Sequence, residues 1–162
     1  KDVVTYALKK ANKLNVKTIL NPAPAAEIDS SLFPLIDYFT PNETEASFYV
    51  DHDVVTYEDA EKAASQLLDK GIKNVVITLG EKGAYFANSE EKFSLPIANL
   101  SNPVVDTTGA GDAFNAGLAA ALTEGKNIKD SLIFASATAG LSTTKIGTAN
   151  SMPSREEIDR IL

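Results

Sequence analysis

The most informative stretch of this chain is "VVDTTGAGDAFNAG", residues 104–117. A short apolar run comes first and predicts a strand over residues 103–108. A small glycine-containing loop follows at residues 109–111, and an acid, Asp112, comes directly after it. Small and apolar residues then recur at helical spacing, which predicts a helix over about residues 110–124. The stretch therefore predicts a strand, a tight loop and a helix that carries an acid in its first turn.

This arrangement is suited to binding an anion. The first amides of a helix have no intrahelical partner and carry partial positive charge. Glycines let a ligand approach these amides closely, so Gly109, Ala110 and Gly111 form a plausible anion cradle. An ionised Asp112 beside a bound phosphate could take a proton from an attacking hydroxyl. The alternative is a structural acid that only complements the helix dipole, and the stretch alone leaves both readings open.

Two better-known phosphate motifs are absent. The pattern G-x-G-x-x-G fails because Phe114 stands at the third glycine position. No Walker A motif is present either, since Gly125-Lys126 is followed by Asn127 and lacks the upstream glycine. A dinucleotide-dependent oxidoreductase is therefore a distant alternative.

Strands alternate with helices along the chain, which predicts βαβ units and an α/β fold with a mostly parallel sheet in a three-layer α/β/α arrangement. Ligands in such folds lie outside the carboxyl ends of the strands. Besides the elements named above, we predict strands over residues 16–20, 36–40, 75–79, 83–88 and 92–97 and helices over residues 4–14, 42–50, 60–71, 128–144 and 154–162.

Composition limits the function classes. The 162 residues suffice for one domain, 44% apolar and 23% charged residues are ordinary for a globular protein, and the net charge is −7. That charge argues against nucleic acid and membrane surfaces as partners. Without cysteine there is no thiolate or disulfide chemistry. No membrane span or signal peptide is visible, so we expect a cytoplasmic protein. The chain starts without Met inside a helical pattern, so we expect a piece of a longer protein.

Two further stretches have both a structural and a functional interpretation. In "TPNETEAS", Asn42 and Glu45 have the spacing of a capping box, which is the more economical reading, but Glu45 could also help to hold a hydrated Mg²⁺. In "ITLGEKGAYF", Gly80 and Gly83 bracket an ordinary hairpin turn or a loop along a nucleotide, with Thr78 near its phosphates.

Three other features carry weaker signals. Residues 143–153 combine a helix end with a Gly-containing loop, whose carbonyl oxygens could hold a monovalent cation. His52 is expected to be a solvated surface residue, since one histidine does not build a metal site. "NPAPA", at residues 21–25, is expected to be a rigid connection.

Together these stretches resemble the ribokinase/PfkB family of carbohydrate kinases. "VVDTTGAGDAFNAGLAAAL" is similar to the family's C-terminal signature, and "NPAPA", "TPNETEA" and "ITLGEKGAYF" follow the family's order. The resemblance covers residues 16–162 and implies an ATP-dependent kinase that phosphorylates a sugar hydroxyl. It covers only the C-terminal half of a family member, without the lid, most sugar contacts and the usual homodimer interface. We therefore expect the isolated chain to bind nucleotide weakly and to phosphorylate inefficiently.

The resemblance also implies roles by position. Catalysis would involve Asp112 as the base and Gly109, Ala110 and Gly111 as the anion hole. ATP would contact Asn42, Thr78, Leu79, Gly80, Glu81, Lys82, Gly83, Gly111 and, near the adenine, Ser136. Glu45 would help to place Mg²⁺, and the ligand positions for K⁺ would be Asp106, Thr108, Ser142, Lys145, Gly147 and Ser151, several of them through backbone carbonyls.

The acceptor stays open at this point. Ribose leads, and the alternatives are fructose, 2-keto-3-deoxygluconate, a nucleoside or a sugar phosphate. A non-catalytic nucleotide-binding domain is the alternative from another class, although a pure binder gains nothing from an acid beside phosphates.

Overall fold

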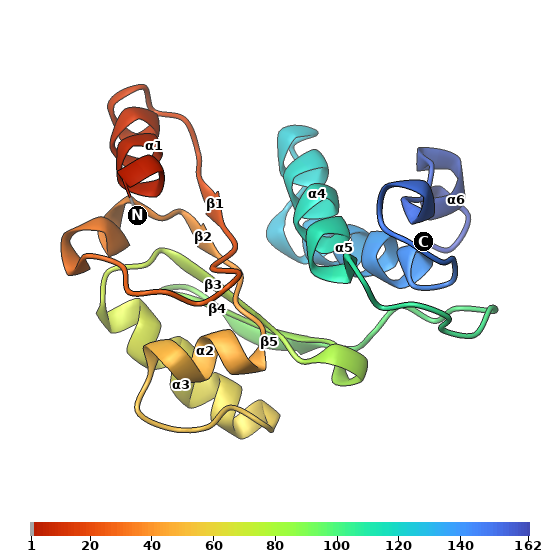
Figure 1. Cartoon of the computed structure of the whole chain (residues 1–162), viewed down its shortest axis with the longest axis horizontal. Coiled ribbons are helices and arrows are strands. Elements are labelled where there is room, and N and C mark those ends of the chain that lie inside the picture. Colours follow the sequence, from red (N-terminus) through yellow and green to blue (C-terminus); the bar gives the residue numbers. More distant parts are fainter. Residues whose placement is uncertain (1) are drawn as a thin grey trace. The chain divides into compact units, whose positions relative to one another are not determined.

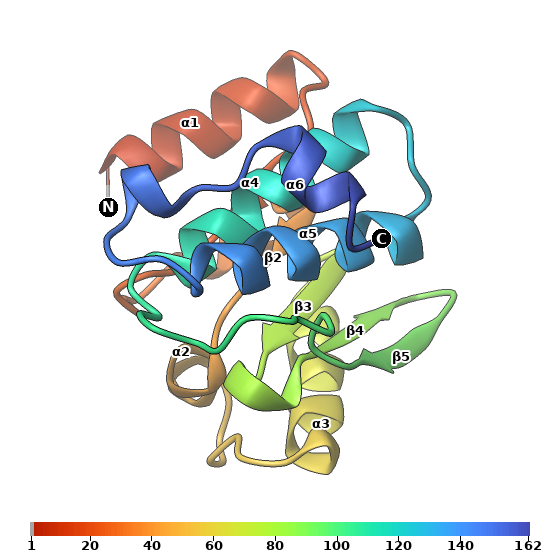
Figure 2. The ribbon, with the colours of Figure 1, turned by 90° about the vertical axis from the view of Figure 1, so that its right-hand side faces the viewer.

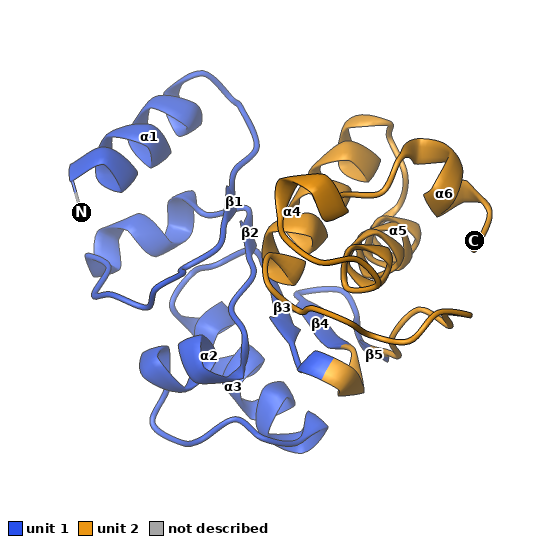
Figure 3. Ribbon diagram, turned by 45° about the vertical axis from the view of Figure 1, so that its right-hand side comes forward, with its two compact units in different colours: residues 1–80, 84–94 blue, residues 81–83, 95–162 orange. Residues whose placement is uncertain are grey.

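The computed structural model describes residues 2–162 (Figure 1). Its residue contacts group into two compact units (Figure 3). Unit 1 comprises residues 1–80 and 84–94, and unit 2 comprises residues 81–83 and 95–162. The assignment of residues 1–162 to the nucleotide-binding part of one kinase domain stays a prediction.

Unit 1 is built on a mixed sheet with the strand order β1-β2-β3-β4-β5. Strands β1, β2 and β3 are parallel to one another, whereas β4 runs antiparallel to β3 and is joined to β5 by a hairpin turn. The elements of this part of the chain are α1 (Asp2–Lys13), β1 (Ile19–Leu20), the 3-10 helix η1 (Ser30–Leu35), β2 (Tyr38–Phe39), α2 (Glu43–Tyr49), α3 (Tyr57–Asp69), β3 (Asn74–Thr78), the 3-10 turn η2 (Gly80–Lys82), β4 (Ala84–Asn88) and β5 (Lys92–Leu95).

The core of unit 1 forms where α3 packs on β3 and β4. Apolar residues recur on one stripe of α3, and its Ala60, Ala63, Ala64 and Leu67 are fully buried. The centre of β3 (residues 75–77) is likewise fully buried, as expected for an inner strand. Burying a side chain such as Leu67 stabilises the folded state by about 2 kcal/mol. The contact between α3 and the sheet therefore helps to fix the positions of β3 and β4.

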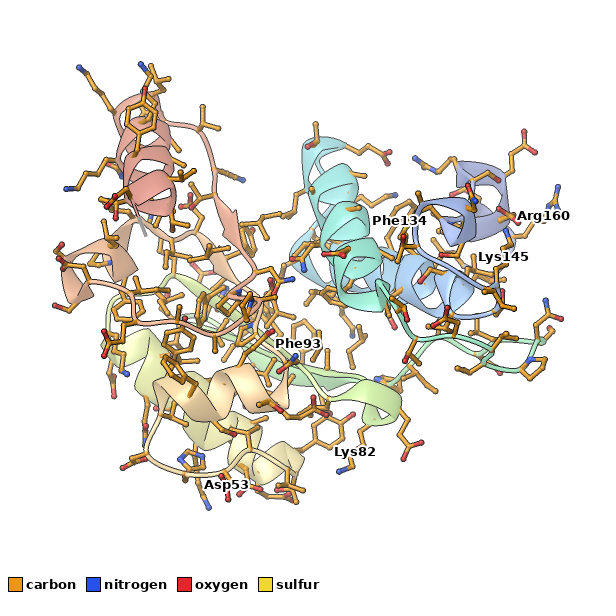
Figure 4. All side chains as sticks on the ribbon, viewed as in Figure 1. Asp53, Lys82, Phe93, Phe134, Lys145 and Arg160 are labelled. Carbon is orange, nitrogen blue, oxygen red and sulfur yellow. The ribbon has the colours of Figure 1, made fainter. Side chains whose placement is uncertain are left out.

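Unit 2 consists mainly of helices: α4 (Ala110–Thr123), α5 (Ile128–Ser142) and α6 (Arg155–Asp159), with the 3-10 turn η3 (Ala149–Ser151) (Figure 2). Helices α4 and α5 approach closely because Gly117 faces Thr138. A Cβ on Gly117 would lie only 2.7 Å from the Thr138 hydroxyl oxygen. Phe134 on α5 packs under the guanidinium of Arg155 on α6, with 5.1 Å between that group and the ring centroid (Figure 4).

Most predicted elements are confirmed, and the α/β class is confirmed with them. The sheet is mixed rather than mostly parallel, because β4 and β5 form a hairpin. β1 and β2 are shorter than predicted. A helical layer on each face of the sheet would involve both units and stays a prediction.

The predicted strand over residues 103–108 is wrong. This segment has no strand pairing, and the amides of Val105 and Asp106 donate to the carbonyl of Thr143, at 2.8 and 3.1 Å. Val104 and Val105 are 61% and 53% exposed. Apolar side chains there made the segment look like a buried strand, whereas its backbone is held by the end of α5.

Within residues 2–162, none of the helices has the length and apolar character needed to cross a bilayer.

Candidate functional site

The N-terminus of α4 offers unpaired backbone donors. Gly109 is the N-cap, has φ +79° and provides no side-chain cap. The amide of Ala110 donates to the carbonyl of Thr107 at 3.1 Å, so this member of the predicted anion hole is already engaged. The amides of Gly111 and Asp112 find no acceptor among residues 2–162. A Cβ on Gly111 would meet nothing within 4 Å, which leaves space for a ligand beside these two donors.

Asp112 is the third residue after the N-cap, and its side chain is exposed. Its carboxylate makes no hydrogen bond or ion pair with any of residues 2–162. Asn115, one turn later, donates instead to the carbonyl of Gly111 at 2.8 Å. The Asp112 carboxylate is thus available to a ligand and lies on the residue next to the free Gly111 amide.

Asp106 ties the loop before α4 to the loop after α5. Its Oδ1 accepts the Thr108 amide at 2.9 Å, and its Oδ2 accepts the Gly147 amide at 3.0 Å. Hydrogen bonds from the Thr108 side chain and from these two amides lower the pKa of Asp106 to about 2. The next residue along, Thr148, lies against Gly109, where an added Cβ would be 3.2 Å from the Thr148 methyl group. The Asp106 carboxylate thus fixes the loop that leads into α4.

The other predicted potassium positions lie around the same two loops. Ser142 and Ser151 are buried, and their hydroxyls donate to the carbonyls of Ala139 and Thr148, at 2.7 and 2.6 Å. The Lys145 ammonium donates to Glu157 on α6 at 2.8 Å (Figure 4). Lys145 could therefore serve a cation only through its carbonyl oxygen, which matches the predicted backbone ligation. Unit 2 brings all six predicted potassium positions to neighbouring segments.

In unit 1, Asn42 and Glu45 form the capping box of α2. The Glu45 amide donates to Asn42 Oδ1 at 2.8 Å, and the Asn42 amide donates to Glu45 Oε2 at 2.9 Å. The structural interpretation of this pair is confirmed. Asn42 also bridges to Thr78 at the carboxyl ends of β2 and β3, so two predicted nucleotide contacts are adjacent.

A magnesium site around Glu45 stays a prediction. Among residues 2–162, no group of three or more His, Cys, Asp or Glu side chains is placed to hold a metal ion. Mg²⁺ commonly takes one or two carboxylates and completes its shell with water and phosphate oxygens. Glu45 accepts the Asn42 amide through Oε2, and its Oε1 has no partner among residues 2–162.

The turn after β3 needs both of its glycines. Gly80 has φ +52° and Gly83 has φ +101°. A Cβ on Gly83 would lie 2.0 Å from the carbonyl oxygen of Leu95, so glycine is required there for packing alone. The rest of the predicted nucleotide turn divides between the units: Thr78, Leu79 and Gly80 belong to unit 1, and Glu81, Lys82 and Gly83 to unit 2.

Ser136 lines a cavity of about 340 Å³ within unit 2. Its walls are mostly apolar, and the side chains of Asn99 and Ser136 are its polar members. The full lining is Leu95, Pro96, Ile97, Ala98, Asn99, Ile133, Ser136, Ala137, Ile161 and Leu162. Asn99 lies four residues after the end of β5 and belongs to no motif of the chain.

Unit 1 has two further features, a cavity at β1 and the contacts of His52. A cavity of about 630 Å³ lies at the carboxyl end of β1, lined in part by the NPAPA segment and Tyr49. His52 was expected to be solvated, but it is only 25% exposed. Its ring nitrogens contact Asp51 Oδ1 and the Asp59 carbonyl, at 3.2 and 3.1 Å. His52 therefore connects the loop after α2 to α3.

Comparisons with known proteins identify relatives of this chain. The chain is 43% identical over 154 residues to ribokinase from Haemophilus influenzae, covering 95% of this chain and 50% of that protein. It is 35% identical to deoxyribokinase from Salmonella typhimurium, covering 99% and 52%. The structure of Arabidopsis thaliana ribokinase complexed with ribose and ATP matches with a TM-score of 0.87 and 34% identity, covering 95% and 50%.

The chain spans about half the length of the curated relatives it matches. The model of the pfkB family carbohydrate kinases matches residues 2–155, nearly the whole chain. By its sequence and its fold, this chain belongs to the pfkB family of carbohydrate kinases.

Proposed function

We propose that the protein containing this chain transfers the γ-phosphoryl group of ATP to a sugar hydroxyl, with ribose as the acceptor and ribose 5-phosphate as the product. The observation that carries the proposal is the N-terminus of α4, where the free Gly111 and Asp112 amides lie beside an unpartnered carboxylate. The similarity to ribokinases favours ribose among the acceptors.

In the proposed reaction, the Asp112 carboxylate takes the proton of the sugar hydroxyl as that oxygen attacks the γ-phosphorus. The new phosphorus–oxygen bond forms while the bond to the bridging oxygen of ADP breaks, and ADP leaves with those electrons. General base catalysis of this kind contributes about 10²- to 10⁴-fold. An exposed carboxylate without a protein partner can reach such a substrate without first breaking an ion pair.

The amides at the start of α4 would stabilise the transferring group. Negative charge spreads over the equatorial oxygens of the phosphoryl group in the transition state. Fixed N–H donors at a helix N-terminus are already oriented toward that charge. Because the Ala110 amide is engaged by Thr107, we assign the donation to Gly111 and Asp112, with Gly109 giving the turn its shape.

Two ions complete the proposal. Mg²⁺ would neutralise phosphate charge, with Glu45 as an outer contact. K⁺ would be held by carbonyl and carboxylate oxygens of residues 106–108 and 142–151. The carbonyl-rich end of α5 fits such a cation. In this chain the Asp106 carboxylate would hold the loop before α4 in place for K⁺, because it accepts the amides of Thr108 and Gly147.

ATP would contact several of the predicted nucleotide positions. We propose that the adenine enters the cavity lined by Ser136, while Asn42, Thr78 and the turn through Gly83 contact the phosphates and ribose of ATP. Support comes from the mostly apolar walls of this cavity, because a flat aromatic base gains from apolar contact on both faces.

Other acceptors stay in competition: deoxyribose, by similarity to the deoxyribokinase, and fructose, 2-keto-3-deoxygluconate, a nucleoside or a sugar phosphate. A cytoplasmic location and a homodimer of the whole protein are likewise proposals.

An ATP-consumption assay of the protein containing this chain, run against a panel of these acceptors with ribose first, tests the function. We expect ADP release that depends on ribose. Nucleotide binding without ADP release for any acceptor would favour the non-catalytic alternative.

A further inference from the structure

Helix α4 carries an asparagine in a run rich in alanine. Asn115 lies in the first two turns, near Ala113 and Ala116, and none of the roles predicted for residues 104–117 falls on it. Asparagine is a poorer helix former than alanine, because its side chain competes for backbone hydrogen bonds. Here that competition has a defined result, since Asn115 Nδ2 donates to the carbonyl oxygen of Gly111 at 2.8 Å.

This hydrogen bond acts on the peptide group that joins Gly111 to Asp112. The carbonyl of Gly111 and the amide of Asp112 belong to that one peptide group, which is planar and rigid. A donor that fixes the carbonyl therefore also fixes the direction of the Asp112 N–H. Because hydrogen bonds in a chain polarise one another, the same contact makes the N–H a stronger donor. The Asp112 amide is one of the two donors that find no acceptor among residues 2–162.

The first turn of α4 lacks two common restraints. Its N-cap Gly109 provides no side-chain cap, and a Cβ on Gly111 would find no atom within 4 Å to pack against. Helix α5 differs, because its N-cap Asn127 accepts the Asp130 amide at 2.9 Å. A cap of that kind at α4 would occupy an amide that the proposed reaction needs. The contact from Asn115 restrains the carbonyl end of the peptide group instead, which leaves the N–H open.

From this we infer that Asn115 is a positioning residue, which holds the peptide group between Gly111 and Asp112 so that the Asp112 N–H points at the transferring phosphoryl group. The inference rests on the proposed function, since it needs a phosphoryl group at the start of α4. Asn115 acts through the peptide group and not by contact with the substrates. Its effect is on the transition state, because a donor already oriented toward the phosphoryl oxygens stabilises the charge that develops there.

Steady-state kinetics of the protein containing this chain, with ATP and whichever acceptor of the panel it phosphorylates, test the inference. Asn115→Ala should lower kcat by about tenfold, less than the roughly 10²- to 10³-fold loss that follows removal of a whole donor. The KM for ATP should stay within about twofold, because the contact serves the transition state rather than ground-state binding. Asn115→Ser should recover most of the lost kcat, since a hydroxyl can also donate to the carbonyl four residues back. Ser47 makes such a bond to the carbonyl of Glu43, at 2.7 Å.

The matched control lies on the same helix. Thr123 Oγ1 donates to the carbonyl of Ala119 at 2.7 Å, which is the same kind of contact at the other end of α4. Thr123→Ala should leave kcat within about twofold of the wild type, because the peptide group that it releases donates to no substrate. Alanine has the higher helix propensity, which offsets the lost hydrogen bond. The unfolding midpoints of Asn115→Ala and Thr123→Ala, followed by circular dichroism, should therefore match that of the wild type.

The outcomes separate the inference from the proposed function. An unchanged kcat in Asn115→Ala, a loss seen only as a higher KM, an equal loss in Thr123→Ala or no recovery in Asn115→Ser would overturn the inference while phosphoryl transfer stands. A kcat loss that accompanies a lower unfolding midpoint of Asn115→Ala would overturn it too, because Asn115 would then serve helix stability alone. If the wild-type protein phosphorylates no acceptor of the panel, the proposed function itself is contradicted, and the inference with it.

Discussion

Asp112 and Asp130 occupy the same position on two helices, the third residue after the N-cap. At α5, the N-cap Asn127 bonds the Asp130 amide at 2.9 Å, and its side-chain nitrogen donates to the Asp130 carboxylate at 2.8 Å. At α4, the N-cap is Gly109, so neither bond exists. An acid that only complemented the helix dipole would be expected to look like Asp130, which is why we favour the catalytic interpretation of Asp112.

This comparison gives a matched pair of variants. In the protein containing this chain, Asp112→Asn should lower kcat by at least ~10²-fold, because the amide cannot take a proton. Asp130→Asn should leave kcat within about twofold, since its carboxylate only supports a cap. A coupled assay of ADP release measures both. Near-normal turnover of Asp112→Asn would remove Asp112 from its role as the base.

The Asp106 carboxylate has a pKa of about 2, below its ordinary value of 3.8, because hydrogen bonds from the Thr108 side chain and two amides stabilise its charged form. A carboxyl whose pKa falls on folding contributes stability that is complete above the unfolded pKa and is lost as pH drops toward the folded one. Asp106→Asn should therefore unfold at a lower temperature than the wild type at pH 7. The difference should shrink between about pH 4 and pH 2.

Thermal unfolding followed by circular dichroism across this pH range measures the difference. A gap between wild type and Asp106→Asn that persists unchanged at pH 2 would show that the carboxylate charge is not what holds the two loops.

At the scale of elements, the capping box of α2 serves two purposes in our account. Asn42→Ala should cost about 1 kcal/mol of stability through loss of the cap, and it should also weaken nucleotide binding. Thr56 caps α3 in the same unit with the same reciprocal geometry and has no proposed ligand. Thr56→Ala should cost a similar free energy of unfolding and leave nucleotide affinity unchanged. Urea unfolding and nucleotide titration of both variants separate the roles, and equal nucleotide affinities would leave Asn42 as a cap only.

The loops at residues 106–108 and 142–151 give the prediction for K⁺. Replacing K⁺ by tetramethylammonium at constant ionic strength should lower ATP turnover, because that ion is too large and too weakly coordinating to order these carbonyls. Turnover that is the same with both cations would show that no cation site exists there.

Local patterns predicted the elements well where the deciding contacts are local. The helix predicted over residues 60–71 and the capping box of Asn42 and Glu45 could be recognised within a few residues, and the structure contains both. The strand predicted over residues 103–108 is wrong because the backbone partner of this segment is the carbonyl of Thr143, which lies far along the chain.

At the scale of the whole molecule, the predicted site divides between the units. Unit 2 holds the catalytic, anion-binding and potassium positions, and unit 1 holds Asn42, Glu45 and Thr78. The sequence could predict this set only through its family resemblance, because spacing alone does not reveal which distant residues share one substrate. The expectation that the isolated chain phosphorylates inefficiently belongs to this scale and stays a prediction.

The central claim is that residues at the N-terminus of α4 catalyse the transfer of a phosphoryl group to a sugar hydroxyl. ³¹P NMR of the protein containing this chain, mixed with ATP, Mg²⁺, K⁺ and ribose, follows this chemistry directly. Our account predicts one sugar phosphate formed for each ADP, with the phosphate on the primary 5-hydroxyl. ADP accompanied only by inorganic phosphate, or unchanged ATP with every acceptor of the panel, would contradict it.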